Sequence, residues 1–333
     1  MHDQWVRLER YVLPKLGKRP LASVERHDVK QLIAGLTIEG HLAPRSIHHV
    51  YDALRSLFAY ALANDPPLVD RTPCTLKVKR GELPVKRDKN PGWRAEATFS
   101  HGELLLLFTD ERNPIDRRAF YALTFFCGNR FGEAAGRRIR DYDKHAQPLG
   151  RIRCATQYDD RPLKGEAPPR DIPVHPFLAW MLEQWLGSGF ELIMGRRPRP
   201  EDWLVPSRMG RVRSLKHMEH RLEQDLERIG LRRRTPHNLR AAFISLAQED
   251  GGERSVLELV THKGNKDVWT GYSRFPWHVV CEHVARLRME PPSSVPSAWP
   301  HSWPHAAGRS SQAIEIIELR KRDGRDLNPR PPA

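Results

Sequence analysis

The sequence predicts a mainly α-helical protein that contains one small antiparallel β-sheet, an α+β fold. Over most of the chain, apolar residues recur three and four positions apart, which is the period of a helix buried on one face. The stretches Leu149 to Tyr158 and Arg170 to Val174 instead alternate apolar and polar residues as strands do, and a turn containing Pro and Gly joins them. With 333 residues and 39% hydrophobic residues, the chain is long enough for about two domains.

Residues 1–73 are expected to form a first, helical domain. Apolar residues at helical spacing begin in Met1 to Gly17, and a second helix is expected over Val24 to Leu36, with Ser23 just before it. A third helix is expected over Arg45 to Ala63, and the prolines that follow it end it.

Residues 74–97 are basic and contain helix-breaking Pro and Gly, so we interpret them as an extended linker between two domains. A plain solvated connector is the alternative to a strap that follows a polyanion. The basic residues of this segment are Lys77, Lys79, Arg80, Lys86, Arg87, Lys89 and Arg94.

Residues 98–289 are expected to form the second domain. Ser100 and Glu103 have the spacing of a capping box at its first helix. Residues 290–333 are rich in Pro and Ser and are expected to be a disordered tail. The further helices expected are Pro114 to Cys127, Arg130 to Arg138, Pro176 to Leu186, Ser214 to Ile229, Pro236 to Glu249, Arg254 to Val260 and Trp277 to Met289.

The charge of the chain favours nucleic acid as its partner. Lys and Arg number 55 against 41 Asp and Glu, a net charge of +14 that attracts polyanions. The sequence has no apolar run near the roughly 20 residues that span a bilayer, so no membrane association is expected. Four cysteines lie far apart, which predicts a reducing, cytoplasmic compartment and argues against a zinc ribbon: Cys74, Cys127, Cys154 and Cys281.

Several polar residues stand where apolar helices or strands end. Arg130 directly follows an apolar helix, and Lys164 lies in the strand-turn-strand region. His237 and Arg240 are three apart at a helix start and therefore share one face. Each such signal is weak by itself, because the same H-x-x-R spacing recurs in His283 and Arg286.

In order along the chain, the set Arg130, Lys164, His237, Arg240, His262 and Tyr272 resembles the signature of the tyrosine recombinases, the integrases of phages and genomic islands. T-F-F-C-G-N-R-F-G-E resembles the first arginine box of that family, and Leu163 to Val174 is similar to its β-hairpin. T-P-H-N-L-R-A-A-F and L-V-T-H-K-G-N-K-D-V-W-T-G-Y resemble the second box and the box that ends in the nucleophile. Asn129 and Thr261 depart from the usual pattern. The resemblance runs from about Trp5 to Leu287.

The resemblance implies a helical, SAM-like core-binding domain followed by a tyrosine-recombinase catalytic domain. It implies a site-specific DNA recombinase that cuts and rejoins DNA through a 3′-phosphotyrosine, integrating or excising a mobile element. Tyr272 would be the nucleophile, His237 its base and Lys164 the general acid. Arg130 and Arg240 would hold the phosphate oxygens.

The supporting residues follow from the same resemblance. His262 would donate a hydrogen bond to a phosphate oxygen, and Glu133 would orient Arg130 or its helix. No metal and no ATP or other cofactor is expected. The arginines supply the positive charge, and the sequence contains no phosphate-binding G-x-x-x-x-G-K-[ST] loop.

The expected partner is double-stranded DNA at attachment sites, bound by both domains. The resemblance implies a homotetramer on paired sites, with a possible directionality or DNA-bending factor, in the bacterial cytoplasm near the nucleoid. For the last three of the following DNA-binding candidates a solvated loop is an equal alternative: Arg45, Lys77, Lys79, Arg80, Arg232, Arg233 and Arg234.

Other functions stay open at this point. A catalytically inactive DNA-binding regulator would keep the fold, and a type IB topoisomerase-like enzyme would keep the nucleophile without pairing sites. A plain helical scaffold is a third possibility. The helix over Trp277 to Leu287 has two open interpretations, docking on a neighbouring protomer or packing on its own core.

The tail suggests one DNA target. Asp326 to Pro329 can be encoded by GATTTGAACC, which is complementary to a common T-arm sequence of tRNA genes. We therefore expect an attachment site in the DNA that encodes this segment; a chance match of four residues is the alternative.

Overall fold

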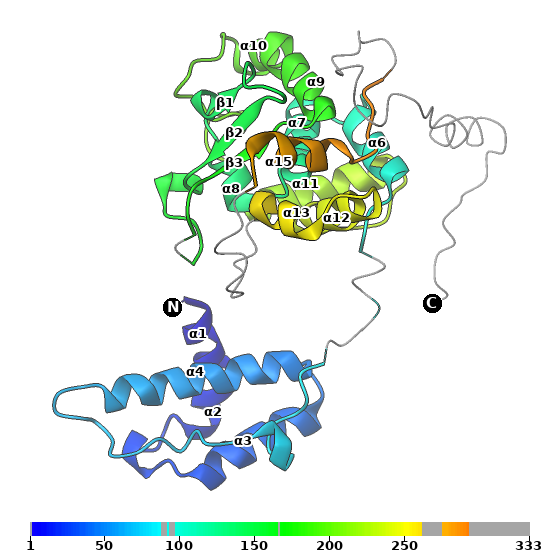
Figure 1. The fold of residues 1–333 in the computed structure, drawn as a ribbon. Coiled ribbons are helices and arrows are strands. Elements are labelled where there is room, and N and C mark those ends of the chain that lie inside the picture. Colours follow the sequence, from blue (N-terminus) through cyan, green and yellow to red (C-terminus); the bar gives the residue numbers. More distant parts are fainter. Residues whose placement is uncertain (1, 88–91, 93–96, 166, 262–274, 293–333) are drawn as a thin grey trace. The chain divides into compact units, whose positions relative to one another are not determined.

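The computed structural model describes residues 2–87, 92, 97–165, 167–261 and 275–292 (Figure 1). The chain divides into two compact units, Met1–Glu96 and Ala97–Ala333. Each unit has its own cluster of buried apolar side chains. The expected tail lies almost wholly outside the described residues.

The first unit is built from helices. α1 (His2–Arg7), η1 (Leu8–Val12) and α2 (Leu13–Leu16) follow one another directly, and after η2 (Leu21–Ser23) come α3 (Arg26–Glu39) and α4 (Pro44–Leu62). Ser23 precedes α3 but does not cap it. Glu25 caps α3 and forms a reciprocal capping box with Asp28, whereas the Ser23 hydroxyl donates to the carbonyl of Pro20 at 2.8 Å.

The start of the basic segment 74–97 packs onto the first unit, which corrects the expectation of an extended linker there. Cys74, Leu76 and Leu83 are buried in the first core. The amide of Leu76 donates to the Tyr51 hydroxyl at 2.9 Å. The short helix η3 (Val78–Arg80) follows. Apolar side chains spaced between the basic ones therefore hold this stretch to α4.

The second unit surrounds a three-stranded antiparallel sheet in the order β1 (Tyr142–Asp143), β2 (Arg151–Cys154), β3 (Arg170–Pro173). Ile152 pairs with Tyr142 on one side and with Ile172 on the other. The mainly α fold with a small antiparallel sheet is confirmed. The two-residue β1 was not expected. The helices are α6 (His101–Thr109), α7 (Ile115–Phe126), α8 (Phe131–Ala135), η4 (Ile139–Asp141), η5 (Tyr158–Asp160), α9 (Pro176–Gln184), η6 (Trp185–Gly189), α10 (Phe190–Met194), α11 (Leu215–Arg228), α12 (Pro236–Glu249), α13 (Arg254–Thr261) and α15 (Trp277–Ala285).

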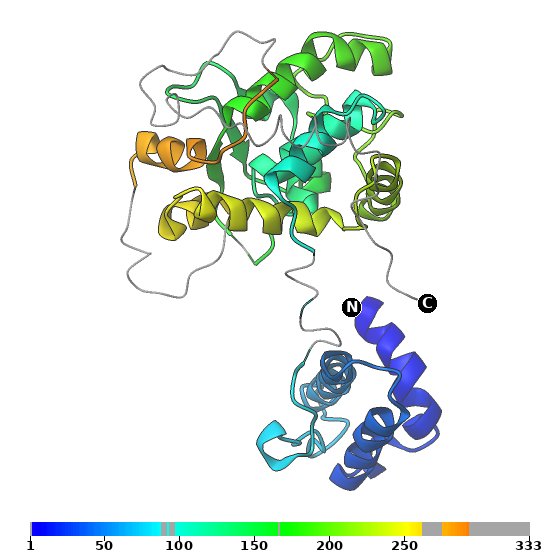
Figure 2. The same cartoon turned by 90° about the vertical axis from the view of Figure 1, so that its right-hand side faces the viewer.

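Helix α7 is the centre of the second core. It packs against α6, α8, α9 and α12, and Figure 2 shows α6 and α7 (cyan) between α12 (yellow) and α9 (green). Its carboxyl end is entirely buried and contributes Phe125 and Phe126, whose rings contact that of Phe108. The predicted capping box is present, since the Ser100 hydroxyl accepts from the amide of Glu103. At Ser214, where a helix was expected to begin, the hydroxyl accepts from the amide of His217 and caps α11.

The helix expected over Arg130 to Arg138 is shorter, since α8 ends at Ala135. Beyond it, the amide of Ile139 donates to the carbonyl of Asp202 at 2.9 Å. Arg138 forms an isolated bridge with Trp203. Pairing with a distant segment replaces the helix, a competition that local sequence does not reveal.

Helix α15 packs on its own unit. Val280, Cys281 and Val284 are buried there. Just after it, the ring Nε2 of His175 contacts the carbonyl of Leu287 at 2.9 Å, and the amide of Arg288 donates to Asp250 at 2.7 Å. Of the two open interpretations, the structure has the core helix.

Candidate active site

Glu133 lies at the centre of the polar cluster in the second unit. It is 2% exposed, and its carboxylate accepts from the backbone amide and a guanidinium N–H of Arg130, both at 3.2 Å. Arg170 donates to the same carboxylate at 2.7 Å. Burial raises the pKa of Glu133, but the charge and hydrogen bond of Arg170 and the bonds from Arg130 outweigh it and hold the pKa below its usual value. A charged carboxylate therefore orients both arginines.

Arg240 belongs to the same cluster and lies in the second turn of α12. It is 7% exposed, and its guanidinium donates to the carbonyl of Gly128. Burial lowers the pKa of Arg240 to about 10, with Glu133 opposing the shift and the charges of Arg130 and Arg170 adding to it. The side chain still carries its positive charge at neutral pH.

Gly128 lets three helices meet beside these arginines. Its φ of +53° is unfavourable for other residues. A Cβ there would lie 2.7 Å from side-chain atoms of both Phe243 in α12 and Thr261 at the end of α13, closer than carbon atoms pack. Glycine is therefore required both by the backbone angle and by the space.

His237 precedes Arg240 by one helical turn and is exposed. The pKa of its imidazole is lowered, first by the partial removal of the ring from water and then by the charges of Arg240 and Arg130. A neutral imidazole can accept a proton. The expectation that His237 and Arg240 share one face of a helix start agrees with α12.

Arg170 is a cluster residue that sequence reasoning missed. Its Nε donates to the carbonyl of Val260 at 2.7 Å, and its terminal nitrogen donates to the Asn129 side chain at 2.9 Å as well as to Glu133. It thereby joins β3, the turn before α8 and the end of α13. Its place in the hairpin motif was the available signal, but a motif position does not show which arginines are buried. Asn129, one of the two departures, serves as a partner of Arg170.

The structure does not place the remaining predicted catalytic residues in this cluster. Lys164 is exposed on the turn between η5 and β3. His262 and Tyr272 fall outside the described residues. The structure thus brings together Arg130, Glu133, His237 and Arg240, and the positions of His262 and Tyr272 stay predictions.

The DNA-binding candidates divide into exposed and buried residues. Arg234 is buried, which corrects the expectation of a phosphate contact: its guanidinium donates to both carboxylate oxygens of Glu103 at 2.7 and 2.8 Å and stacks 4.4 Å from the centre of the Phe99 ring. Arg233 is exposed and pairs with Glu223 at 3.1 Å. The other candidates are exposed: Arg45 in α4, Lys77, Lys79 and Arg80 at η3, and Arg232.

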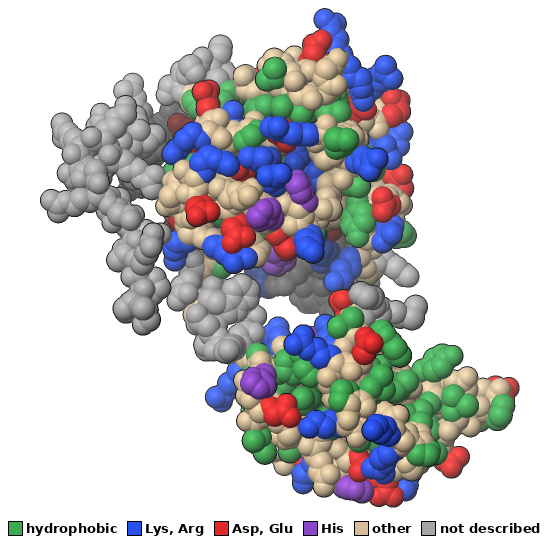
Figure 3. Space-filling view, turned by 180° about the vertical axis from the view of Figure 1, so that it is seen from behind, with side chains coloured by type: hydrophobic (Ala, Val, Ile, Leu, Met, Phe, Trp, Pro, Cys, Tyr) green, Lys and Arg blue, Asp and Glu red, His purple; other side chains and the backbone are tan. Residues whose placement is uncertain are grey.

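The charge on one face of the second unit is mixed. Figure 3 shows Lys and Arg side chains there interspersed with Asp and Glu. No group of three or more metal-binding side chains occurs among the described residues. Within the same part of the chain, no helix is long and apolar enough to cross a membrane.

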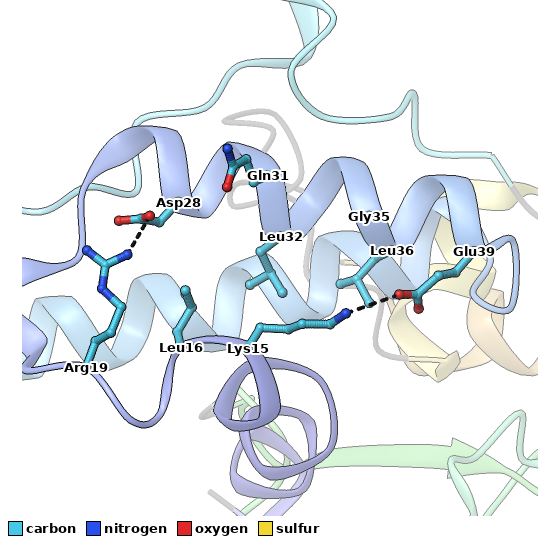
Figure 4. Close-up of a pocket in the computed structure, with 9 residues that line it drawn as sticks. All are labelled: Lys15, Leu16, Arg19, Asp28, Gln31, Leu32, Gly35, Leu36 and Glu39. Carbon is cyan, nitrogen blue, oxygen red and sulfur yellow. Dashed lines mark ion pairs between the residues drawn. The ribbon is translucent and has the colours of Figure 1, made fainter.

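The first unit contains a groove. It lies along α3, with Leu32 and Leu36 among its apolar lining, and two ion pairs flank it (Figure 4). Arg19 pairs with Asp28 at 2.6 Å and Lys15 with Glu39 at 3.7 Å. Both cations are thus engaged within the unit.

Solved structures similar to the chain are integrases and recombinases. An integrase of the transposon Tn1549 with circular intermediate DNA has a TM-score of 0.61 and 15% identity, covering 86% of this chain and 94% of that one. A lambda integrase dimer bound to a COC′ core site has a TM-score of 0.56 and 14% identity, and the match covers 83% of this chain and 91% of that one. XerH site-specific recombinase bound to a palindromic difH substrate has a TM-score of 0.57 and 15% identity, and the match covers 79% of this chain and 71% of that one.

No protein-family model and no curated protein matches the sequence. The likeness to the solved structures shows that the chain has the fold of tyrosine recombinases, and the resemblance stated from the motifs is confirmed at that level.

Proposed function

We propose that this protein is a site-specific DNA recombinase that cuts and rejoins DNA through a 3′-phosphotyrosine intermediate and so integrates or excises a mobile element. The observation that carries the proposal is the cluster of Arg130, Arg240 and His237 around the buried carboxylate of Glu133. The cluster lies in a fold shared with recombinases solved on DNA.

The two guanidiniums suit the charge that develops in the reaction. Attack on a phosphodiester places negative charge on two non-bridging oxygens, and paired N–H donors held in place stabilise it. Glu133 fixes Arg130, and the carbonyl of Gly128 fixes Arg240. Because the partners are set before DNA binds, little reorganisation is required during the reaction.

The proton transfers are assigned to three residues. Tyr272 attacks phosphorus as its hydroxyl proton passes to neutral His237, and a new P–O bond forms. The bond to the 5′-oxygen breaks, and Lys164 protonates that oxygen. Rejoining runs the same steps in reverse. His262 donates a hydrogen bond to a phosphate oxygen.

DNA is bound through the exposed basic residues of both units, Arg45, Lys77, Lys79 and Arg80 in the first and Arg232 and Arg233 in the second. A net charge of +14 supports a duplex as the partner. Four copies are expected on two paired sites.

A suicide substrate tests the proposal. A nicked duplex covering codons 326–329 and their flanks is mixed with the protein and with Tyr272→Phe, and covalent adducts are counted on denaturing gels. We expect an adduct from the unmodified protein alone. DNA binding without an adduct would support an inactive regulator, and an adduct from both would contradict Tyr272 as the nucleophile. Holliday junctions from paired sites would exclude a topoisomerase.

A further inference from the structure

Helix α8 has Arg130 at its amino-terminal end. At its carboxyl-terminal end it packs directly against the backbone of the β2–β3 hairpin. Gly136 is buried there, with an ordinary φ of −84° that any residue adopts. A Cβ at Gly136 would lie 2.6 Å from the amide nitrogen of Tyr158 and 2.8 Å from the carbonyl oxygen of Gln157. The glycine is therefore required by contact alone, and its neighbours are backbone atoms that cannot turn aside.

A second glycine widens this contact. A Cβ at Gly132, one turn earlier, would lie 2.9 Å from the Tyr158 ring. Figure 1 shows α8 beside the hairpin (green). We call the surface formed by Gly132 and Gly136 the glycine seat.

The position of Gln157 is transmitted along the hairpin towards Lys164. The amide of Gln157 donates to the carbonyl of Arg161 at 2.9 Å, and its side chain donates to the carbonyl of Pro162 at 2.8 Å. Leu163 is then buried in the core, directly before Lys164. A shift of Gln157 therefore moves the chain that carries Lys164.

We propose that Gly136 is a positioning residue that places Lys164 relative to Arg130. The glycine seat lets the hairpin that carries Lys164 pack directly against α8, which begins just after Arg130. The five-residue helix α8 thereby fixes the position of the Lys164 ammonium relative to the Arg130 guanidinium. The inference rests on the proposed function, in which Lys164 protonates the leaving 5′-oxygen.

The first test compares two leaving groups. Gly136→Ala, Lys164→Ala and the unmodified protein are assayed on a suicide substrate with a bridging 5′-oxygen and on one with a bridging 5′-sulfur, whose thiolate leaves without a proton. Gly187→Ala is the matched control, because Gly187 is helical and exposed and a Cβ there meets nothing within 4 Å.

On the oxygen substrate we expect Gly136→Ala to cleave at least about tenfold more slowly, since a misplacement near 1 Å costs up to about 100-fold. On the sulfur substrate Gly136→Ala and Lys164→Ala are expected to recover to near the unmodified rate. Equal slowing of Gly136→Ala on both substrates, or no slowing on oxygen, would overturn the proposal. If this variant does not fold, Gln157→Leu removes the bond to Pro162 and is expected to give the same pattern.

The second test needs no catalysis. Trypsin can cut after Lys164, whereas Pro162 protects the bond after Arg161. With DNA absent, we expect Gly136→Ala to be cut after Lys164 several times faster than the unmodified protein and Gly187→Ala, as read by mass spectrometry. If Gly136→Ala were cut at the unmodified rate, the claim that Gly136 positions the hairpin would be refuted. An unmodified protein that forms no adduct on either substrate would instead refute the proposed function, and proteolysis would still decide the position of the hairpin.

Discussion

Two arginines of the triplet at residues 232–234 have different surroundings. Arg232 is exposed, whereas Arg234 is buried against Glu103 and Phe99. The sequence run is uniform, so the difference comes from segments more than a hundred residues away. A buried charge that loses its partner is costly, while an exposed one is not.

We expect Arg234→Gln to lower the free energy of unfolding by roughly 3 kcal/mol, because the ion pair between Arg234 and Glu103 is lost. Arg232→Gln should change stability by less than about 0.5 kcal/mol and lower the slope of DNA affinity against salt by about one. Urea unfolding and salt-dependent DNA binding measure the two effects. Equal stability of both variants would contradict the structural role of Arg234.

At the scale of elements, one buried histidine links α9 to the chain after α15. Nδ1 of His175 accepts from the amide of Phe177, so Nε2 carries the proton and donates to the carbonyl of Leu287. Burial lowers the pKa of His175 to about 4, with the Leu287 bond opposing the shift. The neutral ring is therefore the form that the fold accepts.

The unfolded chain binds a proton at His175 near pH 6.5, whereas the folded chain does so near pH 4. Its contribution is therefore complete above pH 6.5 and is lost as the pH falls to 4, by up to about 3 kcal/mol. His175→Asn keeps a cap acceptor but does not titrate. We expect the stability gap between the two proteins to narrow by this amount between pH 7.5 and 4 in chemical unfolding. If the difference in unfolding free energy between the two proteins stayed constant over this pH range, titration of His175 would not contribute to stability.

At the scale of the molecule, each unit has its own core. The buried side chains of the first core all come from residues 8–83, which includes the packed start of the basic segment. A unit whose buried contacts are internal is expected to fold alone.

We therefore expect a fragment of residues 1–87 to be helical by circular dichroism and to unfold cooperatively on heating. A fragment ending at residue 73 is the control, and it should melt lower because it lacks Cys74, Leu76 and Leu83. Equal melting temperatures would show that residues 74–83 add nothing to the first unit.

The sequence by itself determined the long helices α3, α4, α7, α11 and α12, the strands of the hairpin and the order of the polar motifs. Ser100, Ser214 and the helix start at Pro236 are local signals, and local contacts decide them. His262 and Tyr272 also come from the sequence alone. Helix ends were predictable where a cap or proline stops the chain, but not where a distant segment competes, as after Ala135.

Only the tertiary structure decided which charges are buried and which of them meet. Glu133 accepts a hydrogen bond from Arg170, which is 37 residues away in the sequence, and Arg240 donates to the carbonyl of Gly128, which is 112 residues away. Likewise, Gly136 is recognisable as a contact residue only once Gln157 lies against it. Local sequence sets backbone preference and one-sided burial, whereas the burial of an ion depends on partners that chain folding brings from elsewhere.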